Sequence, residues 1–446
     1  MCLKRNGLSW KQIDVSMLAF TPWGIGGLAI FIIAYGLVVL EEVIDLRKSM
    51  PVILGSALIW LLVGVVFASL GRSAQAQTAA EAVIEQYGEL LLFLLVSITF
   101  VNVLEERRAF DALRAKLSSL GLSTRALFWL LGLCTFVLSI VLANMTTALV
   151  MGAVALKLGR GDAKFITLSC INIVVASNAG GAFCPFGDVT SLMVWQAGKL
   201  DFLAFFHLFV PALVDWLIPA LLMSFSMPKT TLNAAGEKID AKPGTVVVVV
   251  IFAASVALSV YGRSALGLPP VAGMILGLGL LQGFAYMMKR AAKRKHDHEW
   301  VLNSFAAMQR VEWDTLLFFF GIMFAIGGLE QLGWLALANS ALYQNLGATA
   351  ANIAIGPVSA VLDNVPLVYA VLQMNPAMGQ GQWLLLTLAA GVGGSLLAIG
   401  SAAGIALMGL AGKDYTFFKH LRWFPAISLG YVAAMGLHLW LNAALL

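Results

Sequence analysis

Long apolar runs alternate with short polar segments along almost the whole chain. Runs long enough to cross a bilayer lie at about 23–40, 51–70, 88–104, 202–226, 245–261, 268–288, 313–331 and 423–446. A transmembrane helix needs roughly 20 apolar residues, so each run predicts one crossing. Two further apolar regions, about 126–197 and 348–411, are interrupted by Asn, Asp, Gly and Pro. The pattern predicts an all-α polytopic membrane protein with about ten spans.

Composition agrees with a chain that lives in lipid. Of the 446 residues, 60% are hydrophobic and only 11% are charged, which excludes a water-exposed soluble domain. We therefore expect one integral plasma-membrane domain with the bilayer as its surroundings, and no nucleic-acid partner. The cysteines are far apart in sequence, so we expect buried thiols rather than a disulfide framework, a metal site or a cofactor site; they are Cys2, Cys134, Cys170 and Cys184.

Basic residues predict the orientation of the spans. The loop 289–312 holds the densest basic cluster, at 289–295, and is therefore expected in the cytoplasm. Counting spans outward from this loop places further basic residues inside: Arg107, Arg108, Arg114, Lys116, Arg125, Lys229, Lys238, Lys242, Lys413, Lys419 and Arg422. The segment 71–87 falls outside. The N-terminal tail disagrees with the rule, since the same count leaves Lys4, Arg5 and Lys11 outside. No cleavage site follows the first apolar run, so it is expected to remain as a span.

A short motif occurs twice. Val141-Leu142-Ala143-Asn144 reappears as Val361-Leu362-Asp363-Asn364, at an offset of 364 − 144 = 220. The same offset relates Gly180 to Gly400. Upstream, the segment from Glu89 resembles that from Asp314, and by the span count these two helices run in opposite directions. The chain is therefore expected to contain inverted repeats.

The repeat suggests a division of the chain. We expect a tail and first span at 1–50, repeat 1 at 51–226, a cytoplasmic linker at 227–244, and repeat 2 at 245–446. Each repeat should hold a re-entrant hairpin, with tips at 144 and 363, and a broken transmembrane helix, at 177–188 and 393–404. Irregular backbone at membrane depth is tolerated only where protein or a cavity satisfies it, and paired broken helices mark transporter sites.

The residue types at these interruptions suit a partly dehydrated cation. Broken helices expose backbone carbonyls, and hard side-chain oxygens surround them. We expect the ion-binding and proton-coupling groups to be Asn144, Thr146, Thr147, Asn178, Asp188, Thr190, Ser191, Ser359, Asp363, Asn364, Ser395 and Ser401, with Asp188, Asp363, Asn144 and Asn364 as sodium ligands. An ionised carboxylate in the bilayer costs several kcal/mol. Asp188 and Asp363 should therefore hold either a proton or a cation, and this competition would couple the two fluxes.

Other readings of the acids stay open. Each Asp at a break has a structural alternative as a helix cap. Glu89 lies near the expected outer interface and favours a solvated acid at a helix start. Asp215 is also intramembrane, but the repeat offers no counterpart for it.

At these positions the sequence resembles the NhaD family of sodium/proton antiporters, in the superfamily that includes dicarboxylate and arsenite carriers. The resemblance is carried by 177–190, 363–367 and 400–404, and by shorter matches at 104–107 and 418–421. It implies proton exchange coupled to sodium or lithium, elevator-like movement of hairpins and broken helices against a scaffold, a homodimer, and the bacterial inner membrane. Two positions depart from the family pattern: Ala143 replaces the usual Asp, and Ala398 replaces a Ser.

Two other functions fit part of the same sequence pattern. A sodium-coupled carrier of an anionic solute, such as a dicarboxylate, would use the same architecture with helix amides facing the substrate. Asp188 and Asp363 disfavour it, whereas Ala143 favours it. An intramembrane aspartyl protease would use the two acids as a pair. Such enzymes resemble one another through a Gly-x-Gly-Asp motif, and Pro185-Phe186-Gly187-Asp188 lacks its first Gly. Proteolysis also does not explain the repeat.

Overall fold

The computed structural model describes residues 15–44, 46–119, 121–159, 161–227, 239–296 and 298–446. The predicted orientation of Lys4, Arg5 and Lys11 lies outside these residues, as does that of Lys229 and Lys238. Within the described residues, Cys134, Cys170 and Cys184 are free thiols.

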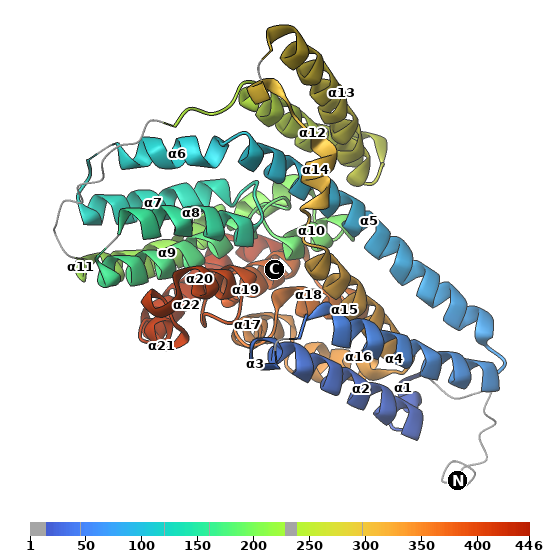
Figure 1. Cartoon of the computed structure of the whole chain (residues 1–446). Coiled ribbons are helices and arrows are strands. Elements are labelled where there is room, and N and C mark those ends of the chain that lie inside the picture. Colours follow the sequence, from blue (N-terminus) through green and yellow to red (C-terminus); the bar gives the residue numbers. More distant parts are fainter. Residues whose placement is uncertain (1–14, 45, 120, 160, 228–238, 297) are drawn as a thin grey trace. The chain divides into compact units, whose positions relative to one another are not determined.

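The described chain is built from helices (Figure 1). The helices of the first half are α1 Val15–Leu18, α2 Pro22–Val39, α3 Glu41–Ile44, α4 Ser49–Ser69, α5 Ser73–Glu106, α6 Ala109–Ser118, α7 Thr124–Leu138, α8 Asn144–Leu158, α9 Ala163–Ala182, α10 Val189–Gln196, η3 Phe202–Leu208 and α11 Phe209–Phe225. Those of the second half are α12 Thr245–Leu266, α13 Val271–Lys295, η4 His298–Trp300, α14 Ser304–Gln309, α15 Trp313–Gln331, α16 Trp334–Asn339, η5 Ser340–Asn345, α17 Ala348–Ser359, α18 Asn364–Met374, α19 Gln380–Gly393, α20 Ala402–Ala411, η6 Gly412–Asp414, α21 Phe417–Leu421, α22 Phe424–Leu441 and η7 Ala443–Leu445.

Nine helical segments among the described residues are long and apolar enough to span a membrane. Eight of them coincide with the apolar runs in the sequence, and the ninth is α9, inside the interrupted region 126–197. The all-α polytopic prediction is confirmed. The re-entrant course of the helix pairs α7–α8 and α17–α18 stays a prediction, as does the division into repeats.

One local prediction was wrong. Glu89 is expected at a helix start, but α5 begins at Ser73 and continues to Glu106. Its first part is rich in Ala, Glu and Gln, which favour helix. Glu89 consequently lies in the middle of a 34-residue helix rather than at a helix start.

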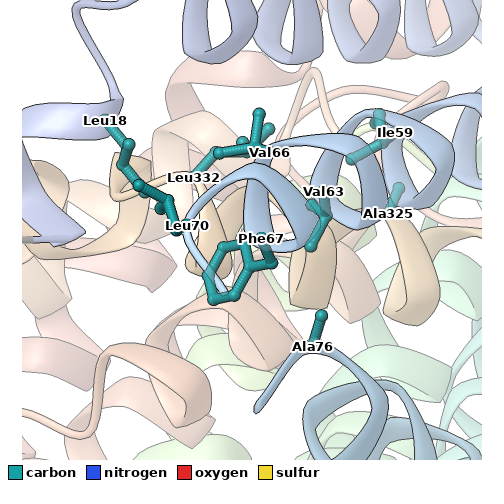
Figure 2. Close-up of a cluster of buried hydrophobic side chains, with 9 residues drawn as sticks. All are labelled: Leu18, Ile59, Val63, Val66, Phe67, Leu70, Ala76, Ala325 and Leu332. Carbon is teal, nitrogen blue, oxygen red and sulfur yellow. The ribbon is translucent and has the colours of Figure 1, made fainter. Parts of the chain in front are cut away.

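The chain divides into two compact units. Unit 1 comprises Met1–Leu91, Glu312–Ala351 and Val365–Ala377. Its core forms where α4 packs between α2 and α15. Figure 2 shows the buried side chains of this core, with Phe67 and Val63 of α4 beside Leu332 and Ala325 from the region of α15. These contacts are apolar throughout, and among the described residues of the cluster none carries a polar side chain.

Unit 2 comprises Leu92–Val311, Asn352–Asn364 and Met378–Leu446. Within it α9 is the central element and packs against α7, α8, α11 and α19. Helix α11 also packs along α22, and α8 packs along α20. The side chains of α9 from Leu168 to Ala182 are all buried, so this helix lies in protein on every side. All of the helix interruptions described below belong to unit 2.

Buried Arg107 joins three segments of unit 2 that the basic residues predict to be cytoplasmic. Its guanidinium donates hydrogen bonds to the carbonyls of Pro243, at 3.2 Å, of Glu299, at 2.7 Å, and of Val301. A single planar group with five donors can hold three chain segments together in this way. The end of α5 is thereby fixed to both ends of the α12–α13 pair.

Candidate functional site

The first broken helix interrupts the chain between α9 and α10. Residues 183–188 are not helical, and α10 begins after Asp188, so the predicted break at 177–188 started too early, because 177–182 continue helix α9. Asp188 has extended backbone, with φ −138° and ψ 143°, and its carboxylate accepts a hydrogen bond of 3.2 Å from the amide of Thr190. The Ser191 hydroxyl donates to the carbonyls of Cys184 and Asp188, at 3.0 and 2.9 Å. The break is therefore a capped and internally bonded turn.

The second broken helix has the same construction. Helix α19 ends at Gly393 and α20 begins after Ser401. Ser401 has φ −141° and ψ 147°, and its hydroxyl accepts a hydrogen bond of 3.3 Å from the amide of Gly404. The two N-cap residues, Asp188 and Ser401, therefore occupy corresponding places with the same backbone conformation but different charge.

These correspondences correct the expected register of the repeat. A Cβ added to Gly181 would lie 2.9 Å from the Gly187 carbonyl oxygen, and one added to Gly394 would lie 2.7 Å from the Gly400 carbonyl oxygen. The matching offsets are 394 − 181 = 213 and 400 − 187 = 213. Gly400 corresponds to Gly187, and its predicted pairing with Gly180 was wrong. The offset is shorter by seven because Asp188 lies 44 positions after Asn144, whereas Ser401 lies only 37 positions after Asn364. Both intervening helices of the second repeat, α18 and α19, are shorter than α8 and α9.

The turns between paired helices keep the expected offset of 220. The Ser139 hydroxyl, after α7, donates to the Ser177 carbonyl at 2.6 Å. The Ser359 hydroxyl, at the end of α17, donates to the Ala390 carbonyl at 3.0 Å. Here 359 − 139 = 220, while 390 − 177 = 213. Each turn is therefore tied by a serine to the broken helix of its own repeat.

Asn178 joins the two repeats. Its amide nitrogen donates to the Ser395 hydroxyl at 2.9 Å, and its amide oxygen accepts a hydrogen bond of 3.1 Å from the amide of Asn144. Asn178 and Ser395 are fully buried and Asn144 is half-buried. The structure thus brings together three predicted site residues, from the first turn, the first broken helix and the second break.

Asp188 makes a second connection between the repeats. The Asn364 amide donates a hydrogen bond of 3.1 Å to one carboxylate oxygen of Asp188. That same oxygen lies 3.6 Å from where a Cβ would stand on Gly391, which places the carboxyl against α19 of the second repeat. Asp363 is near enough to Asp188 for an electrostatic interaction. Two carboxyls and the Asn364 side chain therefore come together from the first break and the second turn.

The remaining predicted residues take supporting positions. Ser191, Ser359 and Ser401 bond to backbone groups as described above, and the Thr147 hydroxyl donates to the Leu142 carbonyl at 3.4 Å. Thr190 is buried beside Asp188, and Thr146 is half-buried in the first turn of α8. Hydroxyl oxygens that donate to a carbonyl still have lone pairs for a cation. Their roles as ion ligands stay predictions.

The structure also identifies two residues that the sequence reasoning passed over. Ser139 is the counterpart of Ser359, and the two serines lie two residues before the repeated Val-Leu-x-Asn motif, at the same offset of 220. His420 is buried in α21, outside the spans, and its Nε2 lies 2.9 Å from the Ser395 carbonyl oxygen. The Tyr415 hydroxyl lies 2.8 Å from Nδ1. A carbonyl only accepts, so Nε2 carries the proton and Nδ1 accepts from Tyr415.

Electrostatics at the site are set by two acids and by neutral polar groups. Among the described residues, no Lys or Arg forms an ion pair with Asp188, and no three His, Cys, Asp or Glu side chains cluster as a transition-metal site would require. Carboxylate, amide, hydroxyl and carbonyl oxygens are the ligands that hard cations prefer. The arrangement can hold one small alkali cation or a proton.

Known proteins match the sequence of this chain over nearly its whole length. Residues 28–391 match the family model CitMHS, described as citrate transporter. The Na(+)/H(+) antiporter NhaD of Alkalimonas amylolytica is 49% identical, over 94% of this chain and 90% of its own length. The NhaD of Vibrio cholerae is 46% identical, over 96% and 94%. Sodium/proton antiporter 1 of Arabidopsis thaliana is 33% identical, over 92% and 71%.

These relatives and the apolar helices show an integral inner membrane protein that transports its substrate and is not an enzyme. The main segments that carried the resemblance, 177–190, 363–367 and 400–404, lie at the two helix breaks and the second turn, and the shorter matches at 104–107 and 418–421 lie at the end of α5 and in α21. The chain belongs to the CitMHS transporter family and, on full-length similarity, to the NhaD antiporters.

Proposed function

We propose that this protein exchanges sodium ions for protons at the site formed by the two helix breaks. The observation that carries the proposal is the buried carboxyl of Asp188, which accepts from Asn364 of the other repeat and has Asp363 nearby. The relatives of highest identity are named for this exchange.

Competition for the carboxyls supplies the coupling. A buried carboxylate without a cation is unfavourable, so the site holds either protons or a metal ion. Sodium entering from one side displaces the protons, and protons entering from the other side displace sodium. Net exchange follows if the site changes its accessibility only when it is occupied.

The site groups all belong to unit 2, which favours movement of the breaks and turns together as one body. We propose an elevator-like alternation on this basis. Lithium, which is smaller but otherwise similar in its ligand preference, is proposed as an alternative substrate. A homodimer is proposed from the family resemblance, and cross-linking in native membranes tests it.

Proton flux into reconstituted vesicles tests the exchange directly. Vesicles loaded with a pH-sensitive dye receive sodium, lithium, potassium or citrate in turn. Sodium or lithium added outside should enter the vesicles while protons leave, so the dye should report an alkaline shift of the lumen. Potassium should cause no shift. Asp363→Asn should abolish the shift. Unchanged sodium-dependent exchange by the double variant Asp188→Asn, Asp363→Asn would overturn both site assignments.

The pH profile gives a second test. Protons compete with sodium for the same carboxyls, so exchange should rise as the pH increases, and the apparent sodium KM should fall. A KM independent of pH would contradict competition at a shared site.

Citrate transport is the second candidate function, because the family model that matches the chain is described as citrate transporter. A tricarboxylate would meet Asp188 and Asp363, and like charges repel at such distances. We therefore expect no sodium-dependent uptake of labelled citrate in the same vesicles. Such uptake without a pH shift would favour this candidate over exchange.

A further inference from the structure

A third intramembrane acid, Asp215, lies outside the site described above. It is in α11, within the helical segment Phe202–Phe225 that is long and apolar enough to span a membrane, and it is close to the middle of that segment. Its side chain is only 1% exposed. Mid-span acids are costly to retain, which makes each of them a candidate for function.

Neither carboxyl oxygen of Asp215 has a hydrogen-bond partner among the described residues. The elements packed against α11 carry the titratable side chains Arg125 and Cys134 of α7, Lys164 and Cys170 of α9, His207 of η3, and Tyr431 and His438 of α22. Among these described groups Tyr431 interacts electrostatically with Asp215. The Tyr431 hydroxyl proton, however, goes to the Ile353 carbonyl, at 2.7 Å. A carboxylate without a donor or a cation is strongly disfavoured, so Asp215 is held as the neutral acid.

Asp215 lies where the last helices of the two predicted repeats cross. A Cβ added to Gly430 of α22 would stand 2.5 Å from the Asp215 carbonyl oxygen, so the two backbones touch there. The residues that follow Asp215 and Gly430, Trp216 and Tyr431, contact corresponding positions in the two repeats. The Trp216 ring stacks on Phe136 of α7, with centroids 5.5 Å apart, and Tyr431 covers Gly356 of α17. Since 356 − 136 = 220, these are corresponding positions.

Both contacts lead to the helix breaks. A Cβ on Gly180 would meet the Phe136 carbonyl at 2.2 Å, and one on Gly393 would meet Gly356 at 2.5 Å. Asp215 therefore lies in the same close-packed body as the broken helices and would move with it. The surroundings that keep the acid neutral are coupled to the part of the protein that carries the ion.

We propose that Asp215 is a second proton-binding site of the transport cycle, which binds and releases one proton per turnover in addition to those exchanged at the breaks. The reaction is reversible protonation of one carboxylate, so the charge moved per cycle increases by one. A proton is the ligand, because a sodium ion needs several oxygens and no other described side chain bonds to this one. The inference rests on the proposed exchange.

Coupling stoichiometry tests the proposal. In vesicles with fixed sodium and pH gradients, the membrane potential at which net flux stops gives the number of protons exchanged per sodium ion. Asp215→Asn should lower this number by one, while Asp215→Glu should keep the wild-type value. Asp201→Asn is the matched control. This exposed residue lies directly before the same span, and its substitution should leave the number of protons per sodium ion unchanged.

The outcomes separate the two proposals. Absence of sodium-driven proton flux in the wild type would end the proposed exchange itself. Normal flux with an unchanged ratio in Asp215→Asn would overturn the role of Asp215 alone. If this variant is inactive, infrared difference spectra of the purified proteins decide: loss of a protonated-carboxyl C=O band relative to the wild type supports proton binding at Asp215, and no loss contradicts it.

Discussion

The two helix breaks share one backbone conformation but carry side chains of different chemistry. Asp188 and Ser401 occupy corresponding N-cap positions with φ and ψ within a few degrees of each other, and both accept a hydrogen bond from an amide of the helix that follows. Only Asp188 brings a carboxyl, and it is this residue that bonds to the other repeat through Asn364. Capping requires an acceptor, whereas exchange for a proton requires a titratable one.

The comparison shows how a duplicated scaffold acquires asymmetric function. The second repeat contributes its carboxyl from the turn, at Asp363, where the first repeat has Ala143. The first repeat contributes its own from the break, at Asp188. The two acids therefore come from non-corresponding positions and still approach each other, because the breaks and turns of both repeats converge in one unit.

The largest effect is expected from removing the charge while keeping the cap. Asp188→Asn retains an acceptor for the Thr190 amide but cannot bind or release a proton. We expect sodium-driven exchange to fall at least ~100-fold, the scale of losing a central electrostatic interaction, with little change in thermal stability. Ser401→Ala is the matched variant. It should lose about 1 kcal/mol of stability and reduce exchange far less than Asp188→Asn, because it removes only a neutral oxygen. Equal losses of exchange in both variants would contradict this difference between the two breaks.

The second break is also tied to a titratable group outside the spans. Burial lowers the pKa of His420 from 6.5 to about 4, and its hydrogen bond to the Ser395 carbonyl raises it only in part. Protonation therefore favours the unfolded chain. The stability contributed by neutral His420 is present above pH 6.5 and is lost as the pH falls toward 4, by up to about 3 kcal/mol.

Melting curves of the purified protein over this pH range check the effect. His420→Gln should be less stable than the wild type at neutral pH but should lose less stability on acidification. Parallel losses in the two proteins would show that other groups cause the acid sensitivity.

Close backbone approach gives a matched pair of stability tests. A Cβ at Gly187 would lie 2.2 Å from the Ser139 carbonyl oxygen, and one at Gly400 would lie 2.6 Å from that of Ala360. Substitution by Ala should destabilise both breaks by about 1–3 kcal/mol, through forced backbone shifts, with Gly187→Ala the worse.

Gly279→Ala is the control, since a Cβ there meets nothing within 4 Å in a helix interior. It should be neutral or stabilising by up to about 1 kcal/mol. Thermal melting ranks the three variants, and a reversed order would contradict the correspondence of the two breaks.

The smallest effect is expected at the link between the repeats. Asn178→Ala removes the hydrogen bonds to Ser395 and Asn144 and should raise the apparent sodium KM about tenfold, near the value of one such bond. Asn178→Asp keeps an acceptor for Asn144 and should lie between Ala and the wild type. A wild-type KM in Asn178→Ala would remove this residue from the site.

Much of this architecture can be predicted from the sequence because lipid imposes simple rules. Apolar length determines the spans, and the repeated Val-Leu-x-Asn motif with its interruptions indicates where backbone leaves helix. The bounds of α15, at 313–331, agree with the sequence to the residue. The start of α5 does not, because a polar but Ala- and Glu-rich segment continues a helix beyond the apolar run.

The sequence by itself determined the membrane class, the helix interruptions and the oxygen-rich residue types within them, since these follow from local composition and periodicity. Only the tertiary structure decided which residues meet: Asn178 with Ser395, Asn364 with Asp188, and Asp215 with the crossing of α11 and α22. It also set the true offset of 213 between the breaks. Contacts between residues about 200 positions apart depend on how helices pack, and a single sequence carries no direct record of that packing.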